Sequence, residues 1–319
     1  MLDTLVAKLE QGLYSNLIKY GNFMKDKFIA ISTALMCLLS SPSISFSETV
    51  NNKVEKHSGL YISGQYKPSV SVFSNFSVKE TNVPTKQLIA LKKDIDSVEI
   101  DASNATKGIS KPEHFNIPYT VEFQDNAVNF NAAIGYSFSE GSRIEVEGFY
   151  EKFDVKNPGG YTKVKDAYRY FALARDLESN KFQPKNKSSS APIGVFHTVM
   201  KNDGLSILAT IANICYDFSL DELSVSPYIC VGMGINAIEF FDALHVKFAY
   251  QGKLGISYQL FPKINLFVNG YYHQVIGSKF KNLNVQYVHD LANVPKVTSA
   301  VATLDVAYFG SEVGIRLTL

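Results

Sequence analysis

The sequence has no Trp, little charge and no run of basic residues. Of its 319 residues, 31 are Lys or Arg and 30 are Asp or Glu, giving a net charge of +1. Nucleic-acid binding needs a basic patch, so this balance excludes nucleic acid as a partner. The 22 Phe and 18 Tyr, with only 19% charged residues, argue against disorder. Together with 20 Gly and many short apolar stretches, they favour β-structure.

The chain also lacks an apolar run long enough for a transmembrane helix. Its most apolar stretch, residues 28–39, has 12 residues, whereas a spanning helix needs about 20. Lys25 and Lys27 precede this stretch, and Ser45 and Ser47 place small residues at the −3 and −1 positions of a cleavage site. These are the three parts of a secretory signal.

We therefore predict two regions. Residues 1–47 comprise an N-terminal extension and a signal peptide, the signal proper being residues 24–47, with cleavage near Ser47. Residues 48–319 form a single exported domain.

A strict alternation of apolar and polar residues runs from Phe248 to Leu260. This is the pattern of a strand with one greasy and one polar face. Seven further segments alternate with varying quality: 60–73, 126–138, 143–153, 205–218, 225–238, 264–276 and 303–319. At 11 to 17 residues they are long for a sandwich and suit tilted membrane-spanning strands. They predict an all-β, transmembrane antiparallel barrel of eight strands. Extra strands near 117–124 and 193–200 would make ten.

Short and long connections alternate between these segments. The short ones are 139–142, 219–224 and 261–263, while 74–125 and 154–204 are long. Outer-membrane barrels have this asymmetry, with short periplasmic turns and long external loops. Helical spacing at 88–98 and 164–174 predicts a short helix in each long loop, and nine residues are expected to connect 225–238 to 248–260.

Charged residues fall on the strand faces that cannot meet lipid. On 143–153 one face carries charges and the other is apolar, and the last strand is expected to shift its phase near Gly310. The predicted interior residues are Lys67, Arg143, Glu145, Glu147, Glu151, Lys253, Glu312 and Arg316. Two roles fit them: packing as ion pairs in a small barrel, or lining a pore. Eight strands enclose a space that side chains just fill, which favours packing.

Two cysteines remain in the exported region, Cys215 and Cys230. If Asp221 pairs with Ser224 across the short turn, the two cysteines lie opposite each other on adjacent strands. A cross-strand disulfide and two reduced thiols both fit this register.

The motifs of enzymes are missing. The six His residues are scattered without an H-E-x-x-H pair, and no G-x-S-x-G occurs. We therefore expect no catalytic site, no metal and no cofactor.

Several stretches together resemble the major surface antigens of the ehrlichiae and anaplasmas, tick-borne intracellular bacteria (Rickettsiales). They are residues 59–82, 132–139, 143–158, 166–176, 226–236 and 252–265. The resemblance implies a bacterial outer-membrane location, a surface barrel with variable loops at 74–125 and 154–204, and passive uptake of small hydrophilic solutes.

The expected partners are outer-membrane lipid, the barrel assembly machinery, small hydrophilic solutes, host cell-surface molecules and antibodies. One departure concerns the assembly machinery, which usually reads a terminal aromatic residue, whereas this chain ends in Leu319. Two functions remain open at this point: a surface antigen with porin-like uptake, or a sealed barrel anchor whose loops contact the host.

Overall fold

The computed structural model describes residues 58–99, 108–109, 112–175, 197–219, 225–286 and 298–319. The chain divides into a unit of residues 1–52 and a unit of 53–319, and every described residue belongs to the second. The predicted signal segment, residues 1–47, lies outside the described residues. Among the described residues, no helix is long and apolar enough to cross a membrane.

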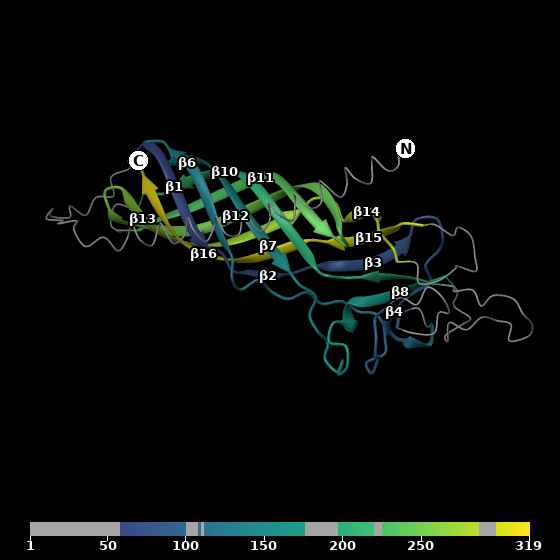
Figure 1. The fold of residues 1–319 in the computed structure, drawn as a ribbon. Coiled ribbons are helices and arrows are strands. Elements are labelled where there is room, and N and C mark those ends of the chain that lie inside the picture. The colour runs from purple at the N-terminus through teal and green to yellow at the C-terminus, as the bar shows by residue number, and fades with distance from the viewer. Residues whose placement is uncertain (1–57, 100–107, 110–111, 176–196, 220–224, 287–297) are drawn as a thin grey trace, which may run out of the picture. The chain divides into compact units, whose positions relative to one another are not determined.

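Eight antiparallel strands of the described chain form one closed barrel, as predicted. In spatial order they are β1 (Gly59–Tyr66), β6 (Phe130–Ser137), β7 (Ser142–Phe153), β10 (Leu205–Asp217), β11 (Val225–Phe240), β12 (Ala243–Phe261), β13 (Ile264–Val275) and β16 (Ala307–Thr318). The sheet closes because β1 also pairs with β16, from Tyr61 opposite Thr318 to Tyr66 opposite Val313. Figure 1 shows these first and last strands, purple and yellow, side by side. The short β2 (Ser69–Ser71) continues from β1 along β16.

The outer face of the barrel is apolar because every second side chain points outward. Isoleucine, leucine, valine and methionine form its middle, including Val231, Met233 and Leu254. Tyr and Phe gather toward the two ends of the strands, in the absence of Trp: Tyr136, Phe138, Tyr216, Phe218 and Tyr258 at one end, and Tyr66, Phe130, Tyr150, Phe248, Tyr272 and Phe309 at the other. An apolar band between aromatic girdles is the lipid-facing surface of outer-membrane barrels.

The two ends of the barrel differ. At one, here the turn end, short connections join β6 to β7, β10 to β11 and β12 to β13. At the other end, which we call the loop end, long connections join β1 to β6, β7 to β10 and β13 to β16. The predicted nine-residue connection between β11 and β12 is wrong, because only Phe241 and Asp242 connect these strands. Both residues have positive φ, 52° and 56°. Such a turn normally contains Asn or Gly, so the sequence carried no signal for it.

The last strand keeps its phase, contrary to the expected shift near Gly310. Pairing of β13 with β16 is continuous from Ile264 opposite Leu317 to Gln274 opposite Ala307. Tyr308 therefore lies inside, fully buried and stacked on His273 at 4.6 Å between ring centroids.

Further strands form two small sheets at the loop end. The first has the order β14 (Lys279–Leu283), β15 (Ala300–Asp305), β3 (Ser74–Glu80). The second has the order β5 (Phe115–Pro118), β4 (Gln87–Leu91), β8 (Tyr170–Ala174), β9 (His197–Lys201). Single-turn 3₁₀ helices η1 (Pro112–His114) and η2 (Ala167–Arg169) precede β5 and β8. We call these elements the loop layer. Of the two extra segments, 117–124 contains only the end of β5, and the described part of 193–200 lies in β9; neither strand enters the barrel.

The two short helices predicted in the long loops are wrong. The first segment begins with strand β4, and the second ends with η2 and strand β8. Both strands are buried on two faces. Ala90 and Leu173 face the apolar core shared with the barrel, while Ile89 and Ala172 face a second core. A strand buried on both faces loses its period of two, and its apolar run then resembles a helical pattern.

The shared core joins the loop end of the barrel to the loop layer. Barrel residues such as Phe153, Ile207 and Phe240 pack with Phe171 and Met200 of the loop layer in one buried cluster. Phe241, held inward by the two-residue turn, joins this cluster, with its ring 4.4 Å from Phe240 and 5.9 Å from Phe171. We call this cluster the apolar cap.

Polar groups are also buried within the loop layer. Glu80 of β3 accepts hydrogen bonds from Arg175, at 2.9 Å, and from Thr198 of β9, at 2.6 Å. Next to Thr198, the fully buried His197 packs its ring on Phe115 at 5.2 Å. Burial, reinforced by the positive charge of Arg175, lowers the pKa of His197 to about 3. His197 is therefore neutral in the folded protein.

We predict that acid loosens the loop layer through His197. An unfolded His has a pKa of about 6.5, so below that pH the unfolded chain takes up a proton that the buried His197 does not. The folding free energy of the loop layer is therefore unaffected above pH 6.5 and becomes less favourable as the pH falls from about 6.5 toward 3. At pH 5 the loss is about 2 kcal/mol. Hydrogen exchange of β8 and β9 at pH 7 and pH 5, corrected for intrinsic rates, measures it. His197→Leu should remove this acid sensitivity and the control His245→Gln should keep it; equal sensitivity in His197→Leu contradicts the prediction.

Candidate functional site in the barrel interior

The structure places all eight predicted charged residues inside the barrel. Along β7, Arg143, Glu145, Glu147 and Glu151 are buried on the inward face together with Phe149, whereas Ile144, Val146 and Tyr150 face outward. Lys67 follows β1, Lys253 lies on β12, and Glu312 and Arg316 lie on β16. None of the eight is more than 9% exposed. Alternation of each strand therefore gathers charges from four parts of the chain into one interior.

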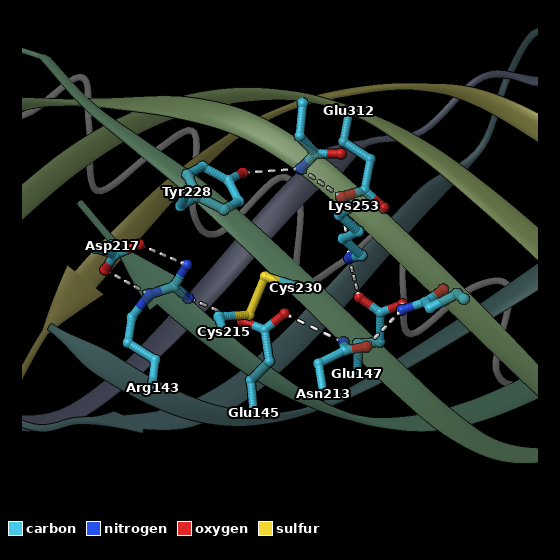
Figure 2. The surroundings of a disulfide bond; sticks show 12 residues. Arg143, Glu145, Glu147, Asn213, Cys215, Asp217, Tyr228, Cys230, Lys253 and Glu312 are labelled. Carbon is cyan, nitrogen blue, oxygen red and sulfur yellow. Dashed lines mark hydrogen bonds and ion pairs between the residues drawn. A yellow bond between two sulfur atoms is a disulfide. The ribbon is translucent and has the colours of Figure 1, made fainter.

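A lysine-centred network crosses the middle of this interior. Lys253 donates to Glu147 on β7 and, at 3.0 Å, to Glu312 on β16. The other oxygen of Glu312 accepts from Lys67 at 2.7 Å. In the sheet, β10 and β11 separate β7 from β12, and β13 separates β12 from β16. Lys253 thus links strands on different sides of the barrel, and we call these four residues the central network (Figure 2 shows three of them).

Amide side chains complete the central network. Gln251 and Asn213 hydrogen-bond each other at 2.8 Å, and Gln251 also donates to Glu147. Asn269 donates to Glu312 at 2.8 Å. A buried carboxylate is stable only when its charge is paired and its lone pairs are satisfied, and these amides meet the second condition.

An arginine cluster occupies the turn end of the interior. Arg143 donates two hydrogen bonds to Asp217 in a bidentate ion pair, from Nε to Oδ2 at 2.7 Å and from Nη2 to Oδ1 at 3.1 Å. It also donates to Glu145 at 3.4 Å and to the Tyr61 hydroxyl at 3.1 Å. Figure 2 shows the Arg143 guanidinium between Asp217 and Glu145. Arg316 lies over the rings of Tyr61 and Phe267, at 5.1 and 5.4 Å.

The cysteines lie beside this cluster. The structure pairs Cys215 directly with Cys230 and joins them by a disulfide. The register derived from the turn between them is therefore the observed one, and of the two redox states left open, the oxidised one is present. Glu145 lies near both sulfurs, but because the sulfurs are bonded to each other the trio is not a metal site.

Toward the loop end the interior becomes aromatic. The Lys67 ammonium lies 3.7 Å from the ring centre of Tyr271 and 4.4 Å from that of Phe149. Glu151 accepts hydrogen bonds from Ser69 at 2.6 Å and from Asn126 at 2.7 Å. From the turn end to the loop end, the interior therefore passes from the arginine cluster through the central network to the apolar cap.

Sequence reasoning missed several members of this interior. Asp217, Tyr61, Asn213 and Asn269 are partners of the predicted charges, yet none was singled out. Tyr61 shares its inward phase with Lys67, and Asn213 and Asp217 share theirs with Cys215, whereas no residue of β13 had been recognised that would have pointed to Asn269. Uncharged polar residues on the inward phase of a strand indicate the barrel interior as well as charged residues do.

This closed barrel, apolar outside and charged inside, defines an outer-membrane β-barrel protein. A family model described as "Surface antigen" matches residues 53–319. The chain belongs to this surface antigen family, which confirms the resemblance and supports an outer-membrane location. The major surface antigen 4 of Anaplasma marginale is 27% identical over 298 residues, covering 90% of this chain and 95% of the relative.

Solved structures of outer-membrane proteins are also similar. Neisserial surface protein A shares 12% identity over 82% of this chain and 97% of its own, with a TM-score of 0.36. OprG from Pseudomonas aeruginosa shares 12% identity over 83% of this chain and 98% of its own, with a TM-score of 0.44.

We predict that Lys253→Met destabilises the barrel by roughly 3–5 kcal/mol, because it leaves Glu147 without its cation in a dry interior. Adding Glu147→Gln should recover part of this loss, since Glu312 keeps Lys67 as its partner. Urea unfolding, followed by the gel shift between folded and heated protein, measures both. Lys263→Met, on the exposed turn, is the control. Equal stability of the single and double variants would rule out the network as described.

Proposed function

We propose that the exported chain is a surface-display protein of the outer membrane, a sealed barrel that anchors the loop layer. The supporting observation is that two different barriers follow each other along its interior. The central network crosses the middle, and the apolar cap lies above it. A cavity lined by Arg143, Lys253 and Arg316 measures only about 10 Å³, room for roughly one water molecule.

In this proposal the loop end faces outward and carries the contacts with host molecules and antibodies. Its surface is polar: Lys156 and Glu122 form an exposed ion pair, and Lys163, Lys165 and Asp166 are exposed as well. The loop layer has its own core, so this surface is held in a defined shape. The signal would direct export and be removed near Ser47, and the barrel assembly machinery would then insert the chain.

Liposome swelling tests the seal. Protein purified from outer membranes is reconstituted, and uptake of sugars and amino acids of graded size is compared with protein-free liposomes. We expect no uptake above that background. Uptake with a size cutoff would overturn the sealed barrel.

Passive uptake is the second candidate, supported by orphaned polar atoms in the interior. Among the described residues, Gln65 Oε1, Asn131 Oδ1, Asn269 Oδ1 and Arg316 Nε have no hydrogen-bond partner. Buried polar groups are almost always satisfied, and water commonly supplies the partner. A hydrated path would pass small hydrophilic solutes. If uptake occurs, Glu145→Gln/Glu147→Gln should change its charge selectivity, and Glu140→Gln, on an exposed turn, should not.

Surface labelling tests the orientation. Intact cells are treated with a membrane-impermeant amine reagent, and modified lysines are identified by mass spectrometry. Lys163 and Lys165 should react on intact cells, because they lie in the loop layer. Lys263, on an exposed connection at the turn end, should react only after lysis. The reverse pattern would place the loop end in the periplasm.

A further inference from the structure

The disulfide is enclosed on every side by the barrel it belongs to. Cys215 and Cys230 are each 2% exposed and form a buried cluster with Tyr228 and Phe267. Their strands are central in the sheet, with β7 hydrogen-bonded along β10 and β12 along β11. The sulfurs therefore cannot be approached through the wall.

The interior blocks the two remaining directions. Arg143, tied to Asp217 and Glu145, occupies the turn end beside the disulfide (Figure 2). The cavity that reaches Cys230 has room for roughly one water molecule, and Lys253 closes it from the centre. Beyond Lys253 lies the apolar cap.

Forming this bond needs an oxidant that contacts the sulfur. A cysteine thiolate attacks one sulfur of the oxidant's disulfide and gives a mixed disulfide with release of one oxidant thiolate. The second cysteine thiolate then displaces the other oxidant sulfur. The two cysteines lose two protons and two electrons, and the oxidant's disulfide is reduced to two thiols. The first step needs the in-line approach of a reagent much larger than water, and this reagent must stay bound to the cysteine until the second step releases it. The closed barrel has no room for it.

The hairpin alone is sufficient to bring the thiols together. The cysteines are 15 residues apart on β10 and β11, which one short connection joins. Pairing of these two strands is enough to set residue 215 opposite residue 230. No other strand of the barrel is required.

We propose that a protein disulfide oxidant forms the Cys215–Cys230 bond on the β10–β11 hairpin before the barrel closes. Oxidation is then a step of assembly that precedes closure. The closed barrel protects the bond from reductants, and a chain that closes without oxidation keeps two trapped thiols.

The order of addition tests this proposal. Protein purified from outer membranes is unfolded and reduced, the reductant is removed under anaerobic conditions, and the chain is refolded into detergent micelles. A thioredoxin-fold disulfide oxidant is added either before or after folding. Free thiols are counted by maleimide mass shift after denaturation. Oxidation should be complete when the oxidant precedes folding, and slower by on the order of 100-fold afterwards, because only opened molecules react.

Each outcome either supports or overturns oxidation before closure. Oxidation of the closed, reduced barrel at the rate of the unfolded chain would overturn the proposal. Failure of the reduced chain to reach the folded gel band, while the oxidised chain reaches it, would support the proposal, because oxidation would then have to come first. A Cys215→Ser/Cys230→Ser variant shows whether closure tolerates loss of the bond, and the reduced chain in urea with the same oxidant controls for oxidant activity.

Discussion

Closure of the sheet between β1 and β16 is the constraint on which the rest of the structure depends. In a membrane, backbone amides and carbonyls have no water to bind, so every strand needs two neighbours. Pairing the first strand with the last meets this need without an edge. It also fixes an inside and an outside for every strand, and thereby decides which side chains meet lipid and which meet each other.

An interior made this way is narrow, and its chemistry follows from its width. Charges placed inside eight strands have little room for water, so each needs an opposite charge, a hydrogen-bond donor or an aromatic ring nearby. Lys253 does so with two carboxylates from different sides of the barrel, and Arg143 with Asp217 and Glu145. The ion pairs of the interior thus tie distant strands to one another.

The strands of the barrel and the inward charges could be predicted because alternation is a local property of the chain. The pairing of Cys215 with Cys230 was accessible for the same reason, since one turn sets its register. Which charges pair with each other could not be predicted. Lys253 and Glu147 are 106 residues apart in the sequence, and no local pattern indicates that they meet. β4 and β8 escaped prediction because burial on two faces removes alternation. The turn at Phe241 escaped because it depends on packing of the aromatic ring into the apolar cap.

The second core of the loop layer has a consequence for how such a chain changes over time. Ile89, Leu91, Phe115 and Val199 pack among themselves, away from the lipid-facing wall. Substitutions at the exposed tips of the loops leave both this core and the barrel untouched. Folding is thus insulated from the residues at the loop tips, and if these tips face outward as proposed, a lineage can replace its outermost residues while keeping the same scaffold.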